Sequence, residues 1–126
     1  MSSRVDEMHT ALLADAKVLA RLEKLRGWTW PALAHARVGI DGESIVFPYR
    51  DADGELVGTA TYAPDPANRN GRPKMMAAAR SRRELFPAPE TLPTGSRWLF
   101  VVEGEPDALR MFSCGVPAVA VPGVQG

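Results

Sequence analysis

The feature that most restricts the fold of this 126-residue chain is an apolar run that stops at a cluster of acids. Residues Trp98–Val102 are continuously apolar, which is typical of a strand covered on both faces in a parallel sheet. The next stretch, "EPDALRMFSC", carries proline in its first turn and predicts a helix that Gly115 ends. "VPAVAVPG" then predicts a second buried strand. A strand–helix–strand order predicts two parallel strands joined by a right-handed crossover.

Three carboxylates lie at the end of the first of these strands. Ligand sites in parallel sheets gather at the carboxyl ends of the strands, where Glu103 lies. Asp107 follows four residues later and can turn back to the same crevice, and Gly104 lets a ligand approach closely. Glu105 and Asp107 are also favourable at a helix N-terminus without any ligand, but this does not explain Glu103. Clustered carboxylates repel one another unless a cation compensates, and oxygen ligands indicate Mg²⁺.

The first part of the chain is predicted to be helical. Apolar residues recur at helical spacing over 3–26, so we expect one helix there, ended by Gly27. A short second helix is expected to follow, with Pro31 in its first turn. Trp28 and Trp30 are interpreted as packing anchors, with base stacking as the alternative.

A β-hairpin is predicted next. "SIVFPYR" has the period of a strand, with Ile45, Phe47 and Tyr49 on one face, and "ELVGTATYA" is the expected return strand. "DADG" between them has the composition of a tight turn. Pro48 predicts an edge strand or a bulge. Asp51 and Asp53 could form a metal-binding pair, but the turn explains both residues fully.

A basic segment follows the hairpin. Residues 66–83 hold six basic side chains and no acidic one, and 75–83 are expected to form a short helix. A proline-rich connector, "LFPAPETLPTG", marks a subdomain boundary. A basic first part beside an acidic end fits phosphate handling next to metal ions, and it also fits chance. The basic residues of the segment are Arg69, Arg72, Lys74, Arg80, Arg82 and Arg83.

Composition limits the compartment and the type of site. The single cysteine, Cys114, excludes an intramolecular disulfide, and His9 and His35 are too far apart in sequence for a zinc motif. The N-terminus lacks the apolar core of a signal peptide, and no apolar run approaches the roughly 20 residues of a membrane span. We therefore expect a soluble cytoplasmic protein without a membrane partner.

The acidic motif and the segment before it resemble one known family. "VVEGEPDAL…GVPAVAVPG" resembles the opening half of a toprim domain, the metal-binding module of bacterial-type primases, topoisomerases and some nucleases. The preceding "VGIDGESIVFPYRDADGELVGTATYAP" and "GRPKMMAAARSRRELFPAP" resemble the region before toprim in phage-type primases and primase–helicases. The resemblance implies a mixed α+β and α/β chain. It also implies three parts: a helical segment (1–37), a β-hairpin and basic-loop subdomain (38–92), and the first half of a toprim domain with a βαβ parallel sheet (96–126).

The resemblance also implies a function, namely Mg²⁺-dependent (or Mn²⁺-dependent) RNA primer synthesis on single-stranded DNA from nucleoside triphosphates, with a replicative helicase fused or separate. It gives Glu103 a catalytic and metal-binding role and Asp107 a metal-binding role. The positions that it assigns to nucleotide or nucleic-acid binding are Lys74, Arg72, Arg69 and Arg50.

The sequence departs from the toprim pattern at one point. A complete toprim domain carries an Asp-x-Asp pair after its second strand, and the sequence stops at Gly126 before that pair. We therefore expect a fragment that binds Mg²⁺ weakly and is inactive alone, with an apolar sheet edge near Val119 and Val121. The alternatives are a non-catalytic nucleic-acid-binding module and a toprim nuclease or topoisomerase fragment. A nucleotide-cofactor fold is disfavoured because G-x-G-x-x-G is missing.

Overall fold

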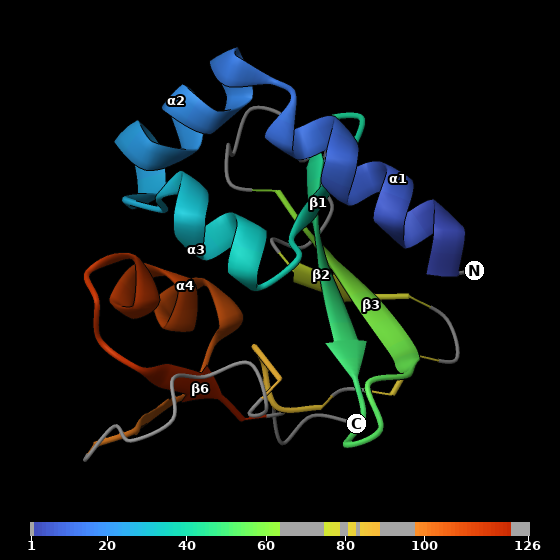
Figure 1. Cartoon of the computed structure of the whole chain (residues 1–126), viewed down its shortest axis with the longest axis vertical. Coiled ribbons are helices and arrows are strands. Elements are labelled where there is room, and N and C mark those ends of the chain that lie inside the picture. The colour runs from blue at the N-terminus through green and yellow to red at the C-terminus, as the bar shows by residue number, and fades with distance from the viewer. Residues whose placement is uncertain (1, 64–74, 79–80, 83, 89–97, 122–126) are drawn as a thin grey trace.

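The computed structural model describes residues 2–63, 75–78, 81–82, 84–88 and 98–121. The chain has a mixed α+β fold, as predicted (Figure 1). Three helices at the N-terminus precede a four-stranded antiparallel sheet, and a two-stranded parallel sheet with one helix follows. None of the described helices has the length and apolarity of a membrane span.

The N-terminal helical region contains two long helices, so the prediction of one helix over 3–26 is wrong. α1 (Ser2–Leu13) and α2 (Ala16–Arg26) are separated at Asp15, whose Oδ1 accepts a hydrogen bond from the backbone N–H of Val18 at 3.1 Å. An aspartate in this position caps a new helix and stops the old one. Gly27 ends α2 with a φ of 73°, as predicted, and α3 (Trp30–His35) is the expected short helix.

The antiparallel sheet has the strand order β1-β2-β3-β4. Its strands are β1 (Gly39–Asp41), β2 (Ser44–Arg50), β3 (Leu56–Tyr62) and β4 (Met75–Ala77). β2 and β3 confirm the predicted hairpin. β4 corrects the prediction of a helix over 75–83, because Met75 pairs with Tyr62 and Ala77 with Ala60 in an antiparallel ladder.

Pro48 lies in β2 at a point where no described strand pairs with one edge of β2. β1 pairs with β2 only as far as Val46, so the β2 edge next to Pro48 has no strand beside it on that side in the described chain. Proline cannot donate a ladder hydrogen bond and is therefore tolerated at such an edge. The register also shifts between Tyr49 and Arg50, which confirms the predicted irregularity.

The core is aromatic and joins the N-terminal region to the C-terminal helix. Trp28 packs on Phe47 and Tyr62 with ring centroids 6.0 and 5.6 Å apart, and Phe47 packs on Phe86 at 5.2 Å. Aromatic pairs of this kind add about 0.5–1.5 kcal/mol each beyond the burial of their area. Leu109 of the C-terminal helix belongs to the same cluster of buried residues. The parallel unit is therefore packed directly on the antiparallel sheet.

The predicted strand–helix–strand unit is present. β5 (Phe100–Val102) and β6 (Ala118–Ala120) pair in parallel, and α4 (Glu105–Ser113) connects them. In Figure 1, α4 and β6 lie on the side of α3 away from α2.

The burial of this unit differs from the prediction. Trp98, which precedes β5, is 73% exposed and Val101 62%, so the described chain does not cover both faces of this segment as expected. The prediction of an apolar edge near Val119 and Val121 is also wrong. Val119 is buried, and the outer side of β6 is bridged by Phe86, which exchanges backbone hydrogen bonds with Ala120. The exposed apolar strand is therefore β5.

Candidate metal and phosphate site

Glu103 directly follows β5, at the carboxyl end of the parallel pair. Its side chain is exposed, and among the described residues it forms no ion pair. Gly104 then occupies the N-cap position of α4. The strand end therefore presents this carboxylate to solvent, where a cation could reach it.

Asp107 lies in the first turn of α4 and is also exposed. A Cβ added at Gly104 would lie 3.7 Å from the Oδ2 of Asp107, so this carboxylate turns back toward the strand end. Gly104 has a φ of −127°, which any residue adopts, and the added Cβ would meet only ordinary contacts. Among the described residues nothing requires glycine here, and a methyl group at this position would touch the Asp107 carboxylate.

Glu105, between these two acids in sequence, has a different environment. It is 5% exposed and accepts a hydrogen bond from the hydroxyl of Tyr49, whose side chain is fully buried. From the sequence alone, Glu105 is a favourable charge at a helix N-terminus. The sequence does not indicate Tyr49 as the partner of Glu105, because 56 residues separate the two positions and no local pattern connects them.

The carboxylates suit a weakly held metal ion. Described residues contain no group of three or more His, Cys, Asp or Glu side chains that could hold a metal ion. Two exposed carboxylates are nevertheless compatible with Mg²⁺, which keeps several waters and is often bound by one or two carboxylates plus substrate phosphates.

Arg50 lines a cavity of about 310 Å³. The cavity lies where β2 has no neighbouring strand, between the end of α3, the turn after β2, and residues 86–88. Its walls are mainly apolar, with Phe86 and Pro87 among them, and Arg37 and Asp53 are charged residues that also line it. A mostly apolar cavity with a few polar groups is the usual form of a small-molecule site.

The Arg50 side chain has partners for some of its hydrogen-bond donors. Its Nη1 donates to the carbonyl oxygen of Gly54 at 3.2 Å, and its Nη2 lies 3.9 Å from the Oδ1 of Asp6. Its Nε is buried without a hydrogen-bond partner among the described residues. An unpaired buried donor is uncommon in folded proteins.

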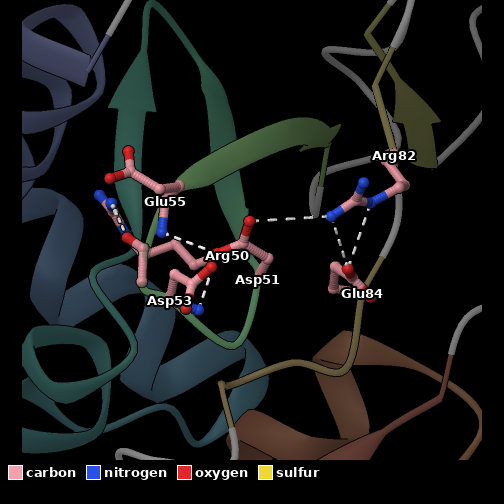
Figure 2. Close-up of polar contacts among 7 residues, drawn as sticks. Arg50, Asp51, Asp53, Glu55, Arg82 and Glu84 are labelled. Carbon is pink, nitrogen blue, oxygen red and sulfur yellow. Dashed lines mark hydrogen bonds and ion pairs between the residues drawn. The ribbon is translucent and has the colours of Figure 1, made fainter.

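The other predicted basic site residues lie outside the described residues: Lys74, Arg72 and Arg69. Of the basic segment, Arg82 is described, and its charge is compensated. Its Nη2 lies 3.1 Å from the Oε1 of Glu84 and 3.9 Å from the Oδ2 of Asp51 (Figure 2). At this one described basic position of the segment, the positive charge is therefore paired with carboxylates.

The structure also bears on two alternatives that the sequence left open: the role of Asp51 and Asp53, and the role of Trp28 and Trp30. The Oδ1 of Asp51 accepts hydrogen bonds from the backbone N–H groups of Asp53 and Glu55, which confirms the interpretation of these aspartates as turn residues. Trp28 is buried, as a packing anchor should be, whereas Trp30 is 53% exposed and does not have that role.

Comparison with known structures identifies the fold. The chain is similar to the E. coli primase catalytic core, with a TM-score of 0.71 at 19% identity over 98% of this chain and 54% of that one. The chain has the fold of a primase catalytic core. It is also similar to the DnaG primase catalytic domain bound to ssDNA (TM-score 0.70, 19% identity, 98% of this chain and 54% of that chain). For the primase fragment of the bacteriophage T7 primase-helicase protein, the TM-score is 0.51 at 25% identity over 78% of this chain and 40% of that one.

These likenesses confirm the resemblance to toprim-type primases at the level of fold. The chain spans about half the length of the primase cores that it matches. Phage-type primases were favoured from the motifs, and the T7 fragment has the highest identity of these three but a lower TM-score than the primase cores. No protein-family model and no curated protein matches the sequence.

Proposed function

We propose that this chain is part of a toprim-type DNA primase, which makes RNA primers on single-stranded DNA. One observation carries the proposal. The primase-core fold extends over 98% of the chain, and within it an exposed glutamate, Glu103, ends a parallel strand. In parallel sheets this is the position where ligands bind.

In this proposal Glu103 and Asp107 hold Mg²⁺ or Mn²⁺. When bound, the metal lowers the pKa of an attacking 3′-hydroxyl and neutralises charge on the leaving pyrophosphate. The role of the two side chains is to fix the cation at the carboxyl end of β5. Glu103 is also the proposed catalytic residue, because it would lie next to the reacting groups. With two carboxylates from this chain, binding is weak, and the chain alone is expected to be inactive.

Basic side chains bind the phosphates of the template and of the incoming nucleoside triphosphate. Arg50 supplies one site, which its position on the wall of the cavity supports. Lys74, Arg72 and Arg69 supply the rest of the positive charge. Contacts of this kind position a strand without reading its sequence.

The proposed partners are single-stranded DNA, nucleoside triphosphates and a replicative helicase, fused or separate. One similar structure is described as bound to ssDNA, and another belongs to a primase-helicase protein. We propose a cytoplasmic location and the three-part division into 1–37, 38–92 and 96–126.

A non-catalytic nucleic-acid-binding module is the second candidate. The lack of a group of three metal-ligating side chains among the described residues favours it. The two candidates differ in their dependence on metal. A primase needs Mg²⁺ or Mn²⁺ for primer synthesis, whereas a binding module holds single-stranded DNA equally well in EDTA.

The test is primer synthesis by the full gene product on a single-stranded template, with labelled nucleoside triphosphates. The enzyme proposal predicts labelled RNA that depends on Mg²⁺ or Mn²⁺ and disappears in EDTA. DNA binding without synthesis under either metal would favour the second candidate.

A further inference from the structure

α4 is fixed to the N-terminal part of the chain at both of its ends. Near its end, the backbone N–H of Thr29 donates to the Oγ of Ser113 at 3.0 Å, and His35 stacks on Phe112 with centroids 5.0 Å apart. At its start, Tyr49 of β2 donates a hydrogen bond to the Oε2 of Glu105. The helix that follows Glu103 is therefore aligned by residues from outside the parallel sheet.

The contact between Tyr49 and Glu105 is buried. Tyr49 is 0% exposed and Glu105 5%. A buried carboxylate is costly unless hydrogen bonds satisfy it, so the tyrosine hydroxyl matters to its position. The N-terminus of α4 adds favourable backbone dipoles.

The burial separates Glu105 from its two neighbours in the acidic motif. Glu103 and Asp107 are exposed, whereas Glu105 points into the protein toward β2. The motif E-G-E-P-D could provide three metal ligands by composition. The geometry gives two outward carboxylates and one inward carboxylate.

We propose that Tyr49 and Glu105 are a positioning pair for the metal-binding loop, and that Glu105 is not a metal ligand. The inference rests on the proposed function, because it assumes that Glu103 and Asp107 bind a cation. The pair holds Gly104 and the first turn of α4 against β2, and so sets the separation of the two outward carboxylates. Groups that support metal ligands in this way typically contribute about 10–100-fold to metal affinity.

Titration of the chain with Mn²⁺, followed by electron paramagnetic resonance, tests the inference. Glu105→Gln keeps an oxygen that accepts the tyrosine hydrogen bond, so its affinity should stay within about threefold of wild type, whereas Tyr49→Phe should lose about tenfold. Tyr62→Phe removes the hydroxyl of another buried tyrosine in the same sheet and should bind Mn²⁺ like wild type. Thermal unfolding of each variant checks that the fold is retained.

Amide hydrogen exchange gives a readout that needs no metal. Exchange of the Ala108 amide, which donates to the carbonyl oxygen of Gly104 at 3.1 Å, should be faster in Tyr49→Phe than in Tyr62→Phe when both variants are equally stable.

The outcomes distinguish a failure of the proposed metal site from a failure of the positioning role of Tyr49 and Glu105. If Glu103→Gln binds Mn²⁺ like wild type, the metal site of the proposed function is wrong. If Glu103→Gln loses affinity and Glu105→Gln loses as much, Glu105 is a ligand and the positioning role is overturned. Unchanged affinity and unchanged exchange of the Ala108 amide in Tyr49→Phe would overturn it as well.

Discussion

The indole N–H of Trp28 donates a hydrogen bond to the carbonyl oxygen of Pro106, 3.1 Å away, although 78 residues separate them. The contact joins the end of α2 to the first turn of α4. Because Trp28 is also the centre of the aromatic core, the helical N-terminus and the acidic loop share one set of buried contacts.

Replacement of Trp28 should therefore destabilise the whole fold. Trp28→Phe removes the hydrogen bond and part of a buried ring, and we expect a loss of about 2 kcal/mol in the free energy of unfolding. Trp30→Phe is the matched control, since Trp30 is 53% exposed, and it should change stability by less than about 0.5 kcal/mol. Urea denaturation followed by circular dichroism measures both. Similar stabilities for the two variants would mean that the contact contributes little.

Arg50 should contribute to the binding of phosphate groups. Arg50→Ala is expected to weaken binding to a labelled single-stranded oligonucleotide and to reduce the dependence of log affinity on log salt by about 0.7–1. Arg4→Ala is the control, because Arg4 is exposed and pairs with Asp41 on the surface. Fluorescence anisotropy at two salt concentrations gives both values. An identical salt dependence in wild type and Arg50→Ala would exclude a phosphate contact at this residue.

The basic segment should act in the same way. Lys74→Ala and Arg72→Ala are expected to weaken single-stranded DNA binding in a salt-sensitive manner. Arg82→Ala should have a smaller effect, because carboxylates already neutralise Arg82. Fluorescence titration of the three variants at two salt concentrations compares them. Equal affinities and no dependence on salt would contradict the prediction.

Gly104 should be needed for function and not for folding. Gly104→Ala meets only ordinary contacts but puts alanine, a poorer N-cap than glycine, at the start of α4, so the free energy of unfolding should fall by no more than about 1 kcal/mol. The added methyl group would lie 3.7 Å from the Oδ2 of Asp107, so metal-dependent primer synthesis by the full gene product should fall. At Gly58, by contrast, a Cβ would lie 2.6 Å from the backbone oxygen of Arg82, so Gly58→Ala should lower the melting temperature. Full activity of Gly104→Ala would mean that no ligand approaches this point.

The exposed strand β5 should promote self-association of this chain. Large exposed apolar patches commonly mark interaction sites, and four consecutive large apolar residues are exposed here, Trp98 to Val101. Val101→Lys should shift the chain toward monomer in sedimentation velocity. Leu25→Lys, at a single exposed apolar residue of α2, should not. The same sedimentation profile for wild type and both variants would contradict the role of β5.

Local patterns predicted much of the fold. The hairpin, the short helix α3 and the strand–helix–strand unit each have signals within a few residues, such as "DADG" or Pro106 two residues after Gly104. The errors arose where a long-range contact decided the outcome. Residues 75–77 form a strand because β3 offers an open edge, and the helix over 3–26 breaks because Asp15 caps a new one.

The candidate site could be predicted only in part. Glu103 was identified from its place after an apolar run, and Asp107 from its spacing. The orientation of Glu105 depends on Tyr49, 56 residues earlier, and no periodicity indicates that pair. The exposure of β5 was missed because apolarity shows what a strand prefers to contact, and not which segment lies beside it.

Primer synthesis by Glu103→Gln in the full gene product tests the central claim most directly. The assay uses a single-stranded template, nucleoside triphosphates and Mg²⁺, with melting temperatures measured alongside and Glu55→Gln as a control in the exposed turn. The account predicts that Glu103→Gln abolishes synthesis while its melting temperature equals that of wild type. Wild-type synthesis by a folded Glu103→Gln protein would contradict the account.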